Sequence, residues 1–143
     1  KGVFNENIVD FKQEGRNKVF FVKKTLEAKQ FVYTVEAQRL LDILKKYPFL
    51  RRMIEIIKKN EKINLAILFG SYAKGIANKN SDIDVYIDTR DKKIKEEVEL
   101  IDSKISLKIG DYDKDSLLIK EIEKDHVIIK GVELFYEKNR FFD

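Results

Sequence analysis

Five consecutive apolar residues, Leu65 to Phe69, run directly into Gly70-Ser71, and ten residues later the chain reads Asp82-Ile83-Asp84. A continuous apolar run of this length is typical of a strand that is covered on both faces. The alternation that begins at Asp82 predicts a second strand over residues 82–88, with the carboxylates on one face and the apolar side chains on the other. This segment therefore requires a layered fold in which at least its first strand lies inside.

The Gly-Ser pair and the two aspartates suit phosphate and metal chemistry. A strand that ends at Gly70 and passes into a short helix, expected over 71–77, exposes backbone N–H groups that favour an anionic phosphate. The hydroxyl of Ser71 adds a donor. Asp82 and Asp84, about 7 Å apart along a strand, can share Mg²⁺ ions, which prefer carboxylates together with substrate phosphate oxygens. Each half alone is compatible with a plain turn or with solvated carboxylates, but together they predict a functional site.

The pattern Gly-Ser, ten residues, Asp-x-Asp resembles the signature of the minimal nucleotidyltransferases of the DNA polymerase β superfamily. Gly70, Ser71, Asp82 and Asp84 match that signature position by position, and the resemblance covers about residues 61–136. It implies an α+β fold with a small mixed β-sheet and flanking helices. It also implies binding of a nucleoside triphosphate, with ATP expected, and transfer of the nucleotidyl group to a hydroxyl with loss of pyrophosphate. Two Mg²⁺ ions, ~3.5–4 Å apart, would stabilise the attacking and leaving oxygens.

One position departs from this family, which commonly places a third carboxylate on the following strand. The stretch 105–109 alternates, and its apolar positions fix the core face, so that Ser106 and Lys108 point to the opposite face. Ser106 stands where the acid is expected, although a serine hydroxyl is a poor Mg²⁺ ligand and no base at neutral pH. Asp102 or Asp111 could replace it only if the strand had a different register. The sequence therefore predicts metal and nucleotide binding more directly than turnover.

Three other features have open interpretations. Lys74, one helical turn beyond Ser71, stands where many relatives carry a basic residue; it either steadies the phosphates or is a solvated surface lysine. His126 is the only histidine, and we expect it to cap or pack rather than to catalyse. The aromatic tail, Phe135-Tyr136 and Phe141-Phe142, is expected to close the core or to contact a second subunit of a homodimer.

Hydrophobic periodicity and turn residues predict the remaining elements. They are, in chain order, a hairpin over 8–24 with its turn at 14–17, a helix over 25–47 capped by Thr25, a second helix after Pro48, a helix around 94–101, a strand over 105–109, a helix over 113–124 and a strand over 127–129, with the chain after Gly131 ambiguous. The buried face of the first helix is expected to hold Tyr33, Ala37, Leu40, Leu41, Leu44 and Tyr47. That of the second is expected to hold Leu50, Met53, Ile54 and Ile57. We divide the chain into a β-hairpin over 1–24, connecting helices over 25–60 and a nucleotidyltransferase domain over 61–143.

The hairpin combines basic and aromatic side chains, namely Lys12, Arg16, Lys18, Lys23 and Lys24 around Phe11, Phe20 and Phe21. It resembles the wing of a winged helix-turn-helix domain, a module that prokaryotic and particularly archaeal proteins join to minimal nucleotidyltransferases. That resemblance implies a weak, salt-dependent contact with DNA phosphate, while the recognition helix would have to precede Lys1. Alternatively, the hairpin packs on the following helix or on a second subunit.

Composition limits the remaining classes. The formal net charge of +4 gives only mild attraction for polyanions, and cysteine is absent, which excludes disulfides and thiolate metal sites. We see neither a secretory signal pattern nor an apolar run near the roughly 20 residues of a membrane span, so a cytoplasmic location without membrane contact is expected. The abundance of Lys, Glu and Ile resembles thermophile usage, and an AT-rich genome would give the same bias.

Two functions from different classes remain, beside the plain alternative of an assembly module that binds neither of their ligands. The first is a Mg²⁺-dependent nucleotidyltransferase whose acceptor is a small molecule or a protein, such as the HEPN-type toxin that relatives modify in toxin–antitoxin pairs. The second is a DNA-binding winged-helix regulator in which a catalytically weakened transferase fold senses a nucleotide.

Overall fold

The computed structural model of the chain describes residues 6–143, so residues 1–5 of the predicted hairpin segment lie outside the described part. The helices and strands are, in chain order, β1 (Val9–Glu14), β2 (Asn17–Val22), α2 (Leu26–Lys46), the 3-10 helix η1 (Pro48–Leu50), α3 (Arg51–Lys59), β3 (Ala66–Phe69), α4 (Gly70–Ala73), β4 (Ile83–Asp88), α5 (Lys92–Glu99), β5 (Ile105–Gly110), α6 (Leu117–Lys124), β6 (Val127–Lys130) and α7 (Val132–Lys138). The α+β class is confirmed. Among the helices of residues 6–143, none combines the length and apolar character that crossing a membrane requires.

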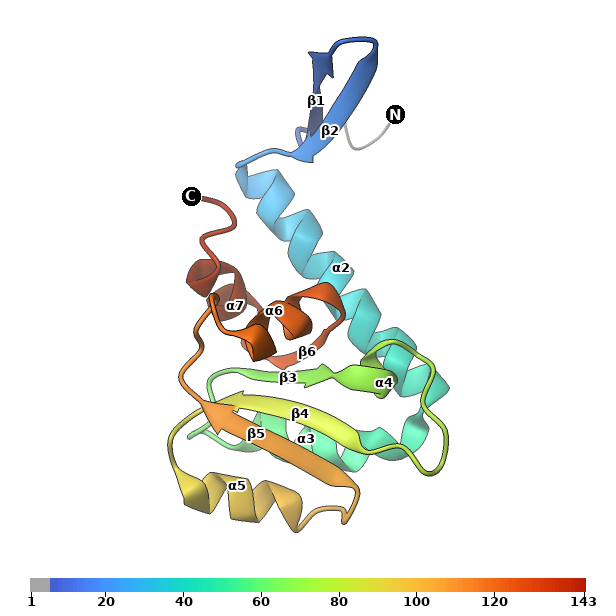
Figure 1. The fold of residues 1–143 in the computed structure, drawn as a ribbon, viewed down its shortest axis with the longest axis vertical. Helices are drawn as coiled ribbons and strands as arrows, with labels where there is room; N and C mark the ends of the chain where they lie inside the picture. Colours follow the sequence, from blue (N-terminus) through green and yellow to red (C-terminus); the bar gives the residue numbers. More distant parts are fainter. Residues whose placement is uncertain (1–5) are drawn as a thin grey trace.

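The central sheet has four strands in the order β5-β4-β3-β6, with β4 and β5 parallel and the other neighbours antiparallel. The predicted small mixed sheet is therefore confirmed. Helices α3 and α5 cover one face, and α6 and α7 cover the other (Figure 1). Alternate residues of β3 enter two separate cores: Ala66 and Leu68 pack with α3 and α5, while Ile67 and Phe69 pack with α6 and α7. Since β3 is buried on both faces, its continuous apolar run is explained.

The helices that flank the sheet begin where side chains cap them. Asp91 accepts a hydrogen bond from the backbone N–H of Lys93 (2.9 Å) and starts α5. Ser116 accepts from the N–H of Ile119 (3.1 Å) and starts α6 at residue 117. The helix predicted from residue 113 is therefore four residues too long at its start, because the serine cap satisfies the first turn only from residue 117 onward.

The C-terminal helix contributes to the second core. Beyond Gly131 the chain forms α7, whose Phe135 is buried, and the ring of Tyr136 contacts those of Phe141 and Phe142 at centroid distances of 5.3 and 5.9 Å. Core closure is therefore confirmed for Phe135 and Tyr136. Phe141 is exposed, and the alternative of a contact with a second subunit stays a prediction.

The long helix α2 packs against this body with a face that overlaps the predicted one: Tyr33, Leu40, Leu44 and Tyr47 are partly buried as expected. Thr25 caps it as expected, accepting from the N–H of Ala28 (3.0 Å). Its fully buried residues are Ala28, Glu36 and Ile43, whereas Ala37 and Leu41 are exposed. The prediction that Ala37 and Leu41 are buried was wrong. It was based on the apolar residues of the helix alone, whereas the face that packs on the body includes the carboxylate of Glu36. The predicted buried face of α3 is confirmed at all four positions.

Glu36 is the one charged residue that is buried among the residues described, at 2% exposure. Its carboxylate accepts from His126 Nε2 (2.8 Å) and from the hydroxyl of Tyr136 (3.1 Å), and it pairs with Arg39 (3.0 Å). Burial alone would raise the pKa of Glu36, but the hydrogen bond from His126 and the charges of His126 and Arg39 outweigh it and hold the pKa below the ordinary 4.5. The cluster joins α2 to α7 and to the residue that precedes β6.

The hairpin of β1 and β2 lies beyond the N-terminal end of α2, apart from the central sheet (Figure 1). Glu14 pairs with Asn17 across a two-residue turn that begins at Gly15, where φ is +62°, so the predicted turn is confirmed. A two-stranded hairpin is marginally stable by itself, so contacts with the residues at the start of α2 help to hold it. Lys23 donates to the side chain of Asn7 (2.8 Å), and Thr25 donates to the carbonyl of Asn7 (2.7 Å).

We predict that Glu36→Ala destabilises the fold by about 3–5 kcal/mol, because it leaves buried donors without their acceptor. Urea denaturation at pH 7 measures the loss, with Glu97→Ala on the exposed face of α5 as the control. Since the pKa of Glu36 is lowered in the folded state, its stabilisation is present above pH 4.5 and is lost as the pH falls through the lowered pKa. The gap between wild type and variant should therefore narrow in acid; a gap that does not depend on pH would contradict the charged cluster.

Candidate functional site

Gly70 stands at the turn from β3 into α4, and the structure requires a glycine there for two reasons. Its φ of +71° lies in the left-handed region. A Cβ on Gly70 would also overlap the carboxylate oxygen Oδ2 of Asp84 and would lie 3.0 Å from Asp84 Cγ. The strand pairing accounts for this approach, because Phe69 is the partner of Asp84 in the β3–β4 ladder. The two halves of the sequence motif are therefore in direct contact.

The two aspartates lie at the start of β4, on the face opposite its core side chains. Ile83, Val85 and Ile87 are buried in the core with α3 and α5, which leaves Asp82 and Asp84 directed to the other side. Asp82 is exposed and Asp84 is half-buried. Burial raises the pKa of Asp84, and the negative charges of Asp82 and Glu121 raise it further, while Lys108 offsets part of this effect. A cation bound between the aspartates would relieve that repulsion.

Ser106 lies beside Asp84, as the sequence predicts. In the parallel β4–β5 ladder Asp84 pairs with Ser106, and Tyr86 pairs with Lys108. The register leaves Asp102 and Asp111 in other roles: Asp102 accepts from the backbone N–H of Lys104 (2.8 Å), and Asp111 is paired with Arg90 at the far end of the strand. The position of the expected third acid is thus occupied by a serine, with a lysine two residues further along.

Glu121 is the acidic residue near this site that the sequence analysis missed. It lies on α6, which packs over the same face of the sheet through Ile119 and Ile122, and its charge acts on Asp84. The helical period identifies which face of α6 is buried, but it does not place that face over a particular strand. Within residues 6–143, no group of three or more histidine, cysteine, aspartate or glutamate side chains is arranged to hold a metal ion. A metal at Asp82 and Asp84 would therefore need further ligands, such as phosphate oxygens.

The helix after the Gly-Ser turn is a single turn. α4 covers residues 70–73 rather than the predicted 71–77, because Gly75, with φ of +73°, ends it. The start of α4 has no side-chain cap, so no capping side chain competes there for its first N–H groups. Ser71 is half-buried at this start, and Lys74 is exposed at its end. The exposure of Lys74 suits both of its interpretations, and its role stays a prediction.

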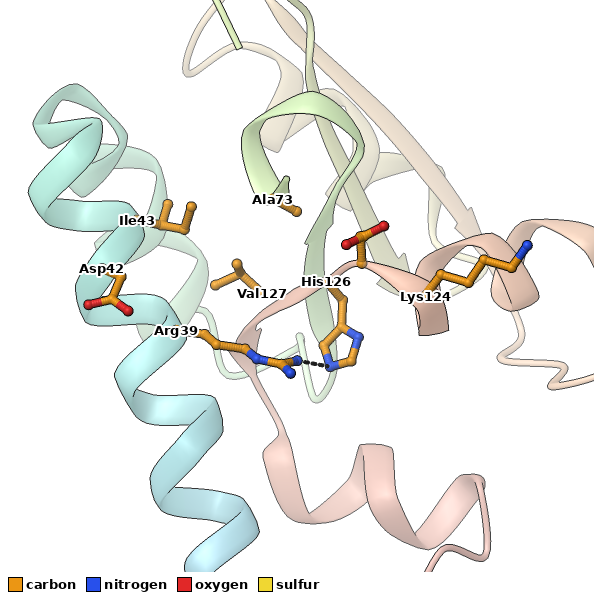
Figure 2. A pocket seen from close by; sticks show the side chains of 8 residues that line it. Arg39, Asp42, Ile43, Ala73, Lys124, His126 and Val127 are labelled. Carbon is orange, nitrogen blue, oxygen red and sulfur yellow. Dashed lines mark hydrogen bonds between the residues drawn. The ribbon is translucent and has the colours of Figure 1, made fainter. Parts of the chain in front are cut away.

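A separate cavity of about 290 Å³ lies between α2, the end of α4 and the junction of α6 with β6. In Figure 2, Arg39 points toward His126 across it, while Ile43, Ala73 and Val127 line its apolar part. None of the predicted site residues lines this cavity. The side chain of His126 is 8% exposed and packs on Phe135 at 4.9 Å between ring centroids. The expected packing role of His126 is confirmed.

Comparison with known protein families identifies the central and C-terminal parts of the chain. A family model described as "Polymerase beta, Nucleotidyltransferase" matches residues 51–140, which include the Gly-Ser turn, both aspartates and Ser106. The match begins at α3 and leaves out the hairpin and α2. No curated protein matches the chain.

We predict that Gly70→Ala destabilises the fold more than Gly75→Ala does. Both glycines have φ near +70°, and a Cβ at Gly75 would meet only the flexible end of Lys46, at 3.3 Å. The left-handed conformation should cost either variant about 1–2 kcal/mol, and Gly70→Ala must additionally displace Asp84. Urea denaturation of the two variants measures the difference, and equal losses would contradict the close contact of Gly70 with Asp84.

Proposed function

Because the chain belongs to the polymerase β nucleotidyltransferase family, we propose that it transfers a nucleoside monophosphate from a nucleoside triphosphate, preferentially ATP, to a hydroxyl group. In this reaction the acceptor oxygen bonds to the α-phosphorus, the α–β phosphoanhydride bond breaks, and pyrophosphate leaves. The hydroxyl proton is released. The acceptor that we propose is a protein or a small molecule, with a HEPN-type toxin as the first protein candidate.

The observation that supports this function most directly is the contact of Gly70 with Asp84. It puts an uncapped helix start, which can receive phosphates, beside a pair of carboxylates whose repulsion favours a cation. Carboxylates on one face of a strand are the donors that Mg²⁺ takes from proteins, provided that phosphate oxygens complete the shell. The residues therefore fit the metal that the family generally uses.

Each site residue has a distinct proposed role. Asp82 and Asp84 would hold one or two Mg²⁺ ions, which supply charge neutralisation at the reacting phosphate. The backbone N–H groups at the start of α4, together with the hydroxyl of Ser71, would bind the terminal phosphates, and Lys74 would add a positive charge. Asp84 is half-buried against the turn and would orient the pair, while Asp82 is exposed and would meet the substrate.

We predict that the Asp82→Asn/Asp84→Asn double variant loses transfer activity by at least about 10²-fold, since it removes the charge that would hold the metal. The assay incubates the protein with labelled ATP, Mg²⁺ and candidate acceptors, and follows both label transfer and pyrophosphate. A Glu96→Gln/Glu97→Gln variant removes two exposed carboxylates from α5 and is the matched control. Transfer that survives the double aspartate change would overturn the mechanism.

A second function is favoured by Ser106 beside Asp84 and by the positive charge of Lys108. In this alternative the chain is a DNA-binding regulator of the winged-helix type, whose weakened transferase fold senses a nucleotide. The basic hairpin would then contact DNA phosphate, and the contact would weaken steeply with salt.

Thermal shift and turnover separate the two functions. The sensor predicts that ATP with Mg²⁺ raises the melting temperature while no acceptor yields pyrophosphate. We predict that in this case Ser106→Asp raises turnover, because it supplies a carboxylate in register with Asp84. Ser103→Asp, the same substitution at an exposed position ahead of β5, is the control for added charge. Equal turnover in both variants would contradict the role assigned to position 106.

A further inference from the structure

The segment between the Gly-Ser turn and the aspartates is held by α2, a helix that lies outside the residues matched by the family. Lys46 Nζ donates a hydrogen bond to the carbonyl of Gly75. The hydroxyl of Tyr47 accepts from the N–H of Ala77 (3.1 Å) and donates to the carbonyl of the same residue (3.4 Å). A single phenol therefore satisfies both backbone polar groups of Ala77.

Tyr47 is itself held in place. It ends α2, where its N–H donates to the carbonyl of Ile43 (2.8 Å), and it precedes Pro48, whose ring restricts the chain that follows. Its ring packs edge-on against Tyr72 of α4, with centroids 4.8 Å apart. The direction of the Tyr47 hydroxyl is thus set by packing and by the backbone, so it can fix the segment that it contacts.

The contacts continue from Ala77 to Asp82. Tyr72 donates to the carbonyl of Asn78 (3.4 Å), and that carbonyl also accepts from the N–H of Ser81 (3.0 Å). In return, Ser81 Oγ accepts from the N–H of Asn78 (2.9 Å). Ser81 directly precedes Asp82, so the hydrogen bonds that fix residues 77–78 also restrict the position of Asp82.

The other end of the segment is tied to the Gly-Ser turn. The N–H of Ile76 donates to the carbonyl of Ser71 (3.0 Å), and the N–H of Gly75 donates to that of Tyr72 (3.1 Å). The carbonyl of Gly75 in turn accepts the hydrogen bond from Lys46 Nζ. The ten residues between the two halves of the motif are therefore anchored to α2 near their middle and to the site at each end.

We propose that Tyr47 and Lys46 are positioning residues for the nucleotide site: they set the separation between the phosphate-binding turn and the metal-binding aspartates. This inference rests on the proposed function, since it assigns a purpose to the clamp at that site. It extends the site beyond residues 51–140, because both residues come from α2 or its C-terminal cap.

Tyr47→Phe tests the proposal, because it keeps the ring that packs on Tyr72 and removes only the hydroxyl. We predict that the dissociation constant for Mn²⁺–ATP, measured by titration calorimetry, rises about fivefold to tenfold, as expected for the loss of one or two hydrogen bonds that order the site. Amide hydrogen exchange should accelerate at residues 78–82, up to and including Asp82, while the melting temperature changes little. Lys46→Met, which keeps most of the aliphatic stem, should change both quantities in the same direction.

Tyr33→Phe is the matched control. It also removes one phenolic hydroxyl, but from the N-terminal half of α2, near the hairpin. There the ring of Tyr33 packs on that of Tyr136, with the ring centroids 5.9 Å apart. It should leave both the Mn²⁺–ATP affinity and the exchange at 78–82 at wild-type values.

Two outcomes would overturn the proposal. Faster exchange at 78–82 with unchanged affinity would mean that the clamp serves packing alone. Lower affinity with unchanged exchange would mean that Tyr47 acts by another route. Failure of the wild type to bind Mn²⁺–ATP is a different result: it would overturn the proposed function itself, and it is recognised without any substitution.

Discussion

The contact between Gly70 and Asp84 is the constraint on which the rest of the site depends. A carboxylate occupies the space where any other residue at position 70 would place its Cβ. Strand pairing brings the two together, since the neighbour of Gly70 is the ladder partner of Asp84. The burial that results makes the charge of Asp84 unfavourable, as its raised pKa indicates. Functional groups that cost stability in this way are common where a ligand later compensates them.

Helix α2 contributes to the body of the protein through polar contacts as well as through apolar packing. Its middle is tied by the carboxylate of Glu36 to His126 and Tyr136, and its end is tied by Tyr47 to the segment that precedes Asp82. A buried carboxylate is costly unless all of its partners are in place. The same cost makes the arrangement specific, because α2 cannot slide or rotate without separating this charge from its donors.

Much of this architecture could be predicted from the sequence, and the failures have identifiable causes. The apolar run of β3 and the alternation of β4 and β5 gave the strands and the direction of Ser106, since side-chain period fixes faces once the core side is known. The predicted buried face of α2 was wrong at Ala37 and Leu41. Glu36 is buried on that helix only because of its tertiary hydrogen-bond partners, which a helical pattern does not reveal. The proximity of Glu121 to the aspartates depends on how α6 crosses the sheet, which periodicity does not encode.

The packing of α2 also bears on how such proteins are assembled from parts. Ile43 belongs to the main core, together with residues of α3 and β3, and Glu36 is bonded to the residue before β6. A fragment that began at residue 51, where the family match begins, would therefore lack Ile43 and expose part of the hydrophobic core. It would also leave His126 and Tyr136 without Glu36, the carboxylate that accepts a hydrogen bond from each of them. The smallest fragment that keeps these contacts therefore begins within α2, near Glu36. A recombination event that replaced the N-terminal hairpin would have to retain about the C-terminal half of α2.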